Sequence, residues 1–281
     1  MGEPKSVADP RWTREQLLKI PTVTPELLDE IEADPRRAVR PTVVETVEGF
    51  VTTTNWVLTS TGTEEAWWRG QQNFTWQLQP GIARTKTRKQ REVSTAREFI
   101  SRARTRHPMP CPGKGDLDEW LFLMQHRRKH TRLLDWTLSP LAALYFAVEA
   151  GKDDGSDAAV FFLSPSMLND SQGHGQKVLF PDDPAVERLI QAAFRDSDQT
   201  EEAVAIIPPE IDQRMLVQRS RFTIHGGVIP LDDHPSAATF LDKWIVPAKA
   251  RAPIRRQLRA LGIDRASLFP DLENLAMDLN D

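Results

Sequence analysis

Chemically capable side chains in this sequence repeatedly follow a short apolar run. Arg69 comes directly after two tryptophans, Gln218 follows Met-Leu-Val, and His225 follows Phe-Thr-Ile. Proteins tend to build rigid sites at the ends of packed elements, because the scaffold fixes a side chain there. The candidate set that this pattern defines is Arg69, Gln71, Gln125, His126, Arg132, Asp135, Gln218 and His225.

The two arginines of this set raise the question of a counter-charge. Arginine is rarely buried unless it is paired. Asp135 can form a close bidentate pair with only one of Arg69 and Arg132. The other arginine would then need an anion. A purely structural pairing of Arg132 with Asp135 is the alternative explanation.

A helix predicted to start at Pro140 offers a second anion-binding feature. Ser139 is a good N-cap residue, and proline is favoured at the first helical position. The N-terminus of a helix presents unpaired N–H groups and the positive end of the helix dipole. Together with the hydroxyls of Thr137 and Ser139 and a nearby arginine, such a terminus would be a receptor for phosphate.

The sequence contains no common nucleotide-binding or hydrolase motif. It has no GxGxxG, no Walker A loop, no HExxH and no GxSxG. His126 and His130 are four residues apart and could share a helix face. Residues 127–129 between them are all cationic and would repel a divalent ion. We therefore expect no metal site.

Acid–base chemistry is a separate hypothesis. His126, Asp135 and His225 would form a catalytic group of a nuclease or hydrolase if the fold brought them together. Histidine catalysis of this kind would give a limb near neutral pH in the pH–rate profile.

Positive charge is concentrated in one segment of an otherwise acidic chain. Residues 84–107 contain nine Lys or Arg and two acids, although the whole chain has a net charge of −4. A basic block of this kind could contact nucleic acid. A solvated loop and helix face is the alternative, and the sequence pI of about 5.9 argues against a dedicated DNA-binding protein.

The pattern of apolar residues predicts a mixture of strands and helices. We interpret residues 1–40 as an N-terminal extension with one short helix that starts at Thr24 and Pro25, and residues 41–281 as one domain. Residues 41–54 fit either a strand or a helix. Strands and helices follow no regular βαβ order, which favours an α+β fold with a mixed central sheet and flanking helices. Expected helices cover 93–104, 116–126, 140–150, 184–194 and 248–261, and expected strands cover 65–70, 131–137, 158–163, 203–208 and 222–225.

Composition places the chain among ordinary globular proteins. It is 40% hydrophobic and 27% charged. Cys111 is the only cysteine, which excludes an internal disulfide and a Cys-rich zinc site. The sequence shows no signal-peptide pattern and no apolar run of about 18 residues. We expect a cytoplasmic protein without membrane contact.

Several motifs together resemble the FRG domain, a family named for its Phe-Arg-Gly motif. They are WWRGQ, WQLQPGIAR, WLFLMQHRRKHTRLLDWTLSPLAALYFAVE, QRSRFTIHG and LGIDRASLFPDL, which run from about residue 64 to about 276. Three positions depart from the family pattern. Trp68 replaces the usual Phe, residues 127–130 replace a Gly-Leu-Pro-like turn, and Ser220 stands where glycine is usual.

The order of these motifs is similar to that of ADP-ribosyltransferases, and this likeness implies roles for several residues. Arg69 would hold the pyrophosphate of NAD. Thr131, Thr137 and Ser139 are candidates for the nicotinamide pocket, and Gln218 for the late catalytic position. Asp135 would supply a carboxylate, which Gln218 lacks. Gln71 and Arg132 complete the candidate cofactor-binding set.

The resemblance implies an NAD-dependent ADP-ribosyltransferase or NAD glycohydrolase with an ADP-ribosyltransferase-like fold. Its acceptor would be a protein or a nucleic acid, and its setting bacterial conflict or phage defence. The alternative is a non-catalytic binding module for a nucleotide or a nucleic acid that uses Arg69, Arg132 and the 84–107 segment.

Overall fold

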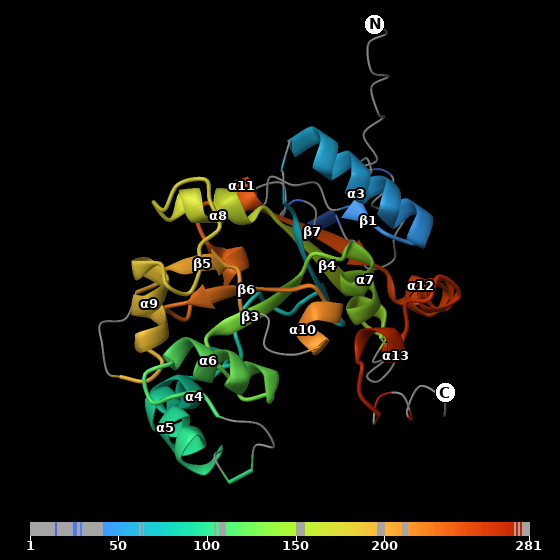
Figure 1. Cartoon of the computed structure of the whole chain (residues 1–281). Coiled ribbons are helices and arrows are strands. Elements are labelled where there is room, and N and C mark those ends of the chain that lie inside the picture. The colour runs from blue at the N-terminus through green and yellow to red at the C-terminus, as the bar shows by residue number, and fades with distance from the viewer. Residues whose placement is uncertain are drawn as a thin grey trace, which may run out of the picture. The chain divides into compact units, whose positions relative to one another are not determined.

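The computed structural model of the chain is shown in Figure 1. It describes residues 42–61, 63, 65–103, 105–106, 111–149, 155–195, 200–209, 213–272, 274 and 276, and a few positions before residue 42. The predicted boundary near residue 40 and the predicted N-cap Thr24 lie outside the described residues, whereas Pro25 and Glu26 of the predicted short helix are helical. None of the described helices is long and apolar enough to cross a membrane.

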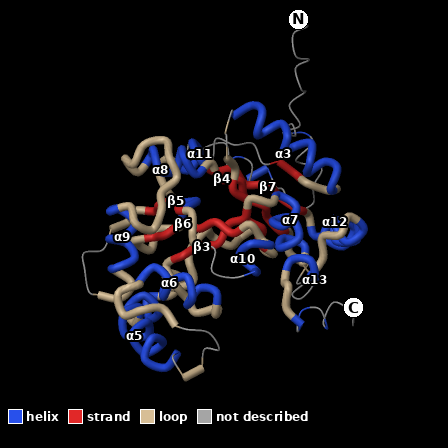
Figure 2. Tube along the Cα trace, in the orientation of Figure 1, coloured by secondary structure: helices blue, strands red, loops and turns tan. Residues whose placement is uncertain are grey.

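The fold is α+β, as predicted, with one mixed seven-stranded sheet in the order β1-β7-β4-β2-β3-β6-β5. Strand β1 pairs with β7 in parallel, whereas β2 and β4 pair antiparallel with their neighbours. Figure 2 distinguishes these strands from the helices around them. The strands are β1 (Thr42–Val43), β2 (Trp67–Gln71), β3 (Leu133–Thr137), β4 (Ala158–Leu163), β5 (Ala203–Ile206), β6 (Ser220–His225) and β7 (Leu241–Val246).

The chain forms two compact units that interleave in sequence. The first contains residues 1–76, 137–164 and 235–281, and the second contains residues 77–136 and 165–234. Helices of the first unit are α3 (Val47–Thr61), α7 (Pro140–Val148), α11 (Ala237–Phe240), α12 (Ala248–Ala260) and α13 (Arg265–Leu268). Helices of the second are α4 (Lys86–Gln90), α5 (Glu92–Ala103), α6 (Leu117–His126), α8 (Pro165–Ser171), α9 (Pro184–Gln191), α10 (Gln213–Val217) and the 3₁₀ turn η2 (Leu231–Asp233).

The core of the first unit lies between one face of β2, β4 and β7 and helices α3, α7 and α12. Trp68 is its centre, because its ring makes edge contacts with Phe50, Phe162 and Trp244 at centroid distances of 5.2–6.1 Å. Helix α7 is apolar on nearly every side and almost entirely buried there. This explains why a helix with so little polar surface is stable at this position.

The core of the second unit joins α5, α6 and α9 to β5 and β6. Figure 2 shows α9 beside these two strands. The apolar face of α6 that the sequence predicts, including Trp120, Leu121 and Met124, is buried in this core. These side chains therefore stabilise the unit rather than line a cofactor site.

Three local features differ from the sequence-based expectations. Residues 41–54 divide between the short strand β1 and the start of α3, so both readings were partly right. Strand β2 continues through Gly70 to Gln71. Asp116, the first residue of the expected helix 116–126, is the N-cap of α6 but makes no side-chain capping hydrogen bond, because its Oδ2 accepts a hydrogen bond from the backbone N–H of Gly113 at 2.8 Å.

Candidate functional site

Arg69 lies on the face of β2 opposite the Trp68 core. It pairs directly with Phe161 of β4, which in turn pairs with Lys243 of β7. Directly paired residues of antiparallel strands project from the same face of a sheet. The first unit therefore presents a guanidinium, a phenyl ring and an ammonium side by side on three neighbouring strands. We call these three residues the Arg69 row.

Lys243 is held by aromatic and carbonyl groups. Its Nζ donates a hydrogen bond to the carbonyl oxygen of Phe74 at 2.6 Å. It also lies 4.0 Å from the ring centroid of Phe74 and 5.1 Å from that of Phe161. These contacts are favourable cation–π geometries, and they fix the charge at one end of the row. Arg69, which is half-buried, also makes contacts with other residues.

Gln71 lies two residues beyond Arg69 and therefore on the same face of β2. Its side chain is buried, and its Oε1 has no hydrogen-bond partner among the described residues. A buried amide oxygen without a partner is costly, because it has lost its contacts with water. Such an acceptor fits a ligand that brings its own N–H or O–H donor.

Thr137 and Ser139 do not share the face of the Arg69 row. Thr137 pairs with Trp68 and so projects toward the opposite face. Its hydroxyl accepts a hydrogen bond from the N–H of Ser139 at 3.0 Å, and the hydroxyl of Ser139 accepts one from Ala142 at 3.3 Å. The predicted N-cap of α7 is thus confirmed, and it already satisfies one of the N–H groups that could have bound a phosphate.

Arg132, in the second unit, pairs with Glu92 rather than with Asp135. Its Nε and Nη2 donate to the two carboxylate oxygens of Glu92 at 2.9 and 2.8 Å. Arg132 is 1% exposed and Glu92 is 5% exposed. Lys89 approaches the same carboxylate at 3.1 Å, and burial together with the charge of Arg132 lowers the pKa of Lys89. Arg132 therefore has its counter-charge within the protein and does not need an external anion.

A chain of hydrogen bonds joins Thr131, Gln125 and Asp135. The hydroxyl of Thr131 donates to Oε1 of Gln125, whose Nε2 donates to Oδ2 of Asp135 at 2.8 Å. The N–H of Leu133 donates to the same threonine hydroxyl at 3.1 Å. Thr131 is buried, but Asp135 is exposed. These hydrogen bonds connect the end of α6 to the start of β3, and the carboxylate of Asp135 stays at the surface.

His225 belongs to a different, buried network. Its Nε2 lies 2.8 Å from the hydroxyl of Thr223, which accepts a hydrogen bond from Nε1 of Trp136 at 3.1 Å. The backbone N–H of His225 donates to the carbonyl oxygen of Arg132 at 2.9 Å. The hydroxyl of Thr223 therefore joins the imidazole of β6 to the indole of β3.

His126 and Gln218 are the remaining predicted catalytic residues. His126 is the last residue of α6, and Gln218 follows α10, with both side chains partly exposed. Arg219, directly after Gln218, has a φ of 48°, which is a left-handed conformation. The left-handed backbone conformation at this turn is therefore adopted by Arg219. Ser220, the next residue, begins β6.

Sequence reasoning missed Phe161 and Lys243. Residues 158–163 were interpreted only as a buried strand, and no strand was assigned to residues 241–246. The signal that could have found Lys243 is the pair Asp242–Lys243 inside an otherwise apolar run. Among the described residues, no group of three or more His, Cys, Asp or Glu side chains could hold a metal ion.

One part of the sequence matches a known protein family. Residues 64–156 match the FRG domain. An FRG domain spans this part of the chain. No curated protein and no solved structure matches the chain. The extension of the resemblance to about residue 276 stays a prediction.

The FRG match includes β2, α5, α6, β3 and α7, and therefore the residues after which the family is named. Here the motif reads Trp68-Arg69-Gly70. Trp68 fills the core, Arg69 projects from the opposite face, and Gly70 lies against α7. Two of the three residues therefore have structural roles, and the arginine is the one whose charge could serve a ligand.

Proposed function

We propose that this FRG domain protein binds NAD or a closely related pyrophosphate nucleotide at the Arg69 row and uses it in ADP-ribosyl transfer or NAD hydrolysis. The observation that carries the proposal is the buried Oε1 of Gln71, which has no hydrogen-bond partner in the described part of the chain and lies on the same strand face as Arg69. The order of motifs adds support, because an arginine early in the sheet holds the pyrophosphate in ADP-ribosyltransferases.

The residues fit the chemical groups of this ligand. A guanidinium can donate two parallel hydrogen bonds to phosphate oxygens, which a lysine cannot do with the same geometry. The amide oxygen of Gln71 would accept from a carboxamide, an amino group or a ribose hydroxyl. The ring of Phe161 lies between the two cations and is itself fully buried, so it supports them rather than stacking with a base.

The reaction breaks the bond between the nicotinamide nitrogen and the ribose C1′, and the bonding electron pair leaves with nicotinamide. An oxygen or nitrogen nucleophile, water in the case of hydrolysis, forms the new bond to C1′ and releases a proton. Positive charge develops on the sugar in the transition state, and a carboxylate near it is stabilising. The family resemblance implies Gln218 as an orienting amide and Asp135 as this carboxylate. Asp135 lies two residues before Thr137 on β3 and projects, like Thr137, toward the face opposite the Arg69 row. The Asp135→Asn variant below therefore tests whether it takes part in the reaction.

Binding and cleavage are tested separately with the full chain. Isothermal titration calorimetry measures NAD binding, and chromatography measures nicotinamide release. The Arg69→Ala variant should weaken binding by about tenfold to over a hundredfold, because each lost charge-assisted contact is worth roughly 1.5–3 kcal/mol. Gln71→Leu should also weaken binding, because it removes the acceptor. Arg256→Ala, at an exposed arginine of α12 in the same unit, is the control and should bind normally.

The outcomes separate a binding module from an enzyme. Release of nicotinamide that disappears in Asp135→Asn, with binding retained, would support the catalytic role of that carboxylate. NAD binding without any nicotinamide release would leave a nucleotide-binding module. If the wild-type chain binds no NAD, or if Arg69→Ala binds it as well as the control does, the Arg69 row is not a nucleotide site.

A further inference from the structure

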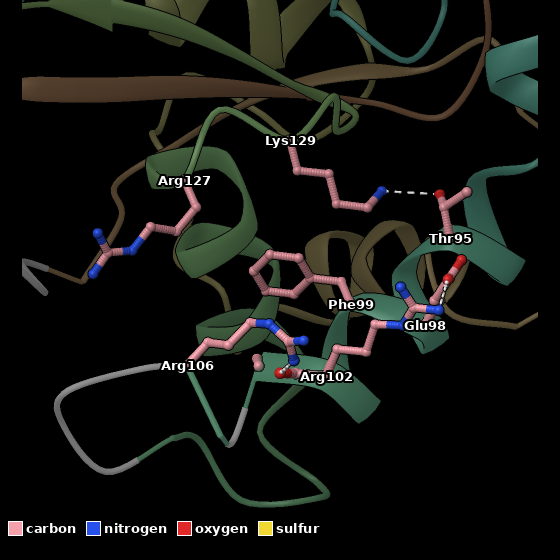
Figure 3. Close-up of a pocket in the computed structure, with 8 residues that line it drawn as sticks. Thr95, Glu98, Phe99, Arg102, Arg106, Arg127 and Lys129 are labelled. Carbon is pink, nitrogen blue, oxygen red and sulfur yellow. Dashed lines mark hydrogen bonds and ion pairs between the residues drawn. The ribbon is translucent and has the colours of Figure 1, made fainter.

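Two basic segments that are separate in the sequence meet in the second unit. The first is the 84–107 segment, and the second is the cationic run at residues 127–129. Both contribute to one pocket of about 560 Å³, shown in Figure 3. Its lining residues are Thr95, Glu98, Phe99, Arg102, Ala103, Arg106, Arg127 and Lys129. Sequence reasoning identified the charge but had no means to place the two segments together.

The pocket has four cationic side chains and one carboxylate. That carboxylate, Glu98, forms an ion pair with Arg102 at 2.8 Å. Nζ of Lys129 lies 3.0 Å from the hydroxyl of Thr95, and Nη1 of Arg106 donates to the carbonyl oxygen of Arg102 at 2.9 Å. Lys129 and Arg106 thus face neutral acceptors, and the lining side chains, four cations and one carboxylate, carry a net positive charge that attracts anions.

An aromatic ring lies among these charges. In Figure 3 the ring of Phe99 stands between Lys129 on one side and Arg102 and Arg106 on the other. Phe99 is partly buried against the core of the second unit, which fixes its position. A fixed aromatic surface beside cationic groups is the combination that binds the base and the phosphate of a nucleotide.

The positive field continues beyond the pocket. His130, the neighbour of Lys129, is partly desolvated and lies near Arg88 and Arg84, and these effects together with Lys129 lower its pKa. Nη1 of Arg88 donates to the carbonyl oxygen of Gly81, and the ring of His130 lies against Gly81, so further cationic charge adjoins Lys129. A free nucleotide would use the pocket alone, whereas a longer strand carries further phosphates for these charges. The observations therefore favour a polymer with several phosphates.

We propose that the pocket between α5 and the end of α6 binds single-stranded nucleic acid, with one base against Phe99 and the neighbouring phosphates against the four cationic side chains. This inference is independent of the proposed NAD site, because the pocket and that site share no residue. It assigns a physical role to the basic segment.

Fluorescence anisotropy with labelled single-stranded DNA and RNA of about 12 nucleotides tests the proposal on the full chain. Four phosphate contacts should give a slope of about −3 in log affinity against log salt concentration. The double variant Arg127→Ala/Lys129→Ala should lose about tenfold in affinity and reduce the magnitude of the slope by about 1.4. The double variant Arg256→Ala/Arg259→Ala removes the same charge from α12 of the first unit and should bind normally.

Phe99→Leu keeps an apolar contact with the core but removes the aromatic face. It should weaken binding about fivefold with an unchanged salt slope. Circular dichroism of every variant checks that the fold is retained. Equal losses in the two double variants would overturn the proposal, as would the absence of binding at low salt. Equal affinity for duplex DNA, inorganic polyphosphate or adenosine monophosphate would also overturn it, because none of these requires a strand with unpaired bases.

Discussion

Gly70 of β2 lies directly beneath the backbone of Ala143 in α7. A Cβ atom at position 70 would overlap the carbonyl oxygen of Ala143 and would approach the backbone nitrogen of Ala147 to 2.6 Å. Both atoms belong to a helix backbone, which cannot rotate away as a side chain can. The glycine of the FRG motif is therefore explained by the close approach of a helix to a strand. Because side chains alternate along β2, the neighbouring Arg69 projects from the opposite face of the sheet.

Gly70→Ala should destabilise the protein by about 1–3 kcal/mol or more, because the added methyl group forces α7 away from the sheet. Urea denaturation followed by tryptophan fluorescence measures the change in the free energy of unfolding. Gly115→Ala is the control, since no heavy atom lies within 4 Å of its added Cβ. Equal stability of the two variants would mean that α7 does not pack on β2 in this way.

The buried ion pair between Glu92 and Arg132 gives a second stability prediction. Glu92→Ala should cost about 3–5 kcal/mol, because it leaves a buried guanidinium without its carboxylate. Glu98→Ala, on the same helix, removes a pair with Arg102 in which both side chains are more than half exposed, and it should cost less than about 1 kcal/mol. Thermal denaturation compares the two.

The double variant Glu92→Ala/Arg132→Met separates the charge from the packing. It removes both members of the pair, so no uncompensated charge stays buried. Its stability should recover a substantial part of the loss in Glu92→Ala. If the loss in the double variant equals the sum of the losses in Glu92→Ala and Arg132→Met, the two side chains stabilise the protein through packing rather than through their charges.

Local sequence signals were sufficient for most of the fold. Ser139 and Pro140 predicted the start of α7, and the apolar run at residues 158–163 predicted β4, because capping chemistry and strand burial depend on neighbouring residues. Strand β7 was missed because the polar pair Asp242–Lys243 interrupts its apolar pattern. The structure explains the lysine of this pair, because Lys243 contacts the carbonyl oxygen and ring of Phe74 and the ring of Phe161.

The pairing of charges could not be predicted in the same way. Asp135 is three residues from Arg132 and was the alternative partner that the sequence offered for it, but Glu92, forty residues earlier, is the carboxylate that Arg132 contacts. Alternation along β3 also separates the exposed Asp135 from its buried neighbour Trp136. The partner of a buried arginine is decided by which helix packs over it, and a single sequence does not contain that information.

The hydroxyl of Thr223 joins two buried polar rings, and its removal gives a third stability prediction. Thr223→Val should leave Nε1 of Trp136 and Nε2 of His225 without this partner and should cost about 1–3 kcal/mol. Thr52→Val makes the same chemical change at an exposed position of α3 and should be nearly neutral. If guanidinium unfolding gave equal midpoints for both variants, the network would contribute nothing to stability.

His130 should report the positive field of the second unit through its titration. Burial, followed by the charges of Arg88, Arg84 and Lys129, lowers its pKa below the ordinary value near 6.5. In the folded protein the neutral imidazole is thus favoured, and the unfolded chain binds a proton at higher pH. The stability that His130 contributes is therefore present above about pH 6.5 and is lost as the pH falls toward its folded pKa. Proton NMR of the imidazole against pH measures this value directly.

Arg88→Ala should raise the pKa of His130, whereas Arg256→Ala, in the first unit, should leave it unchanged. A bound single strand would bring phosphates close to the same ring and should also raise the pKa, because nearby negative charge favours the imidazolium form. The titration would then provide a signature of binding that does not depend on a label. A pKa at or above the ordinary value in the free protein would contradict the positive field that we infer around His130.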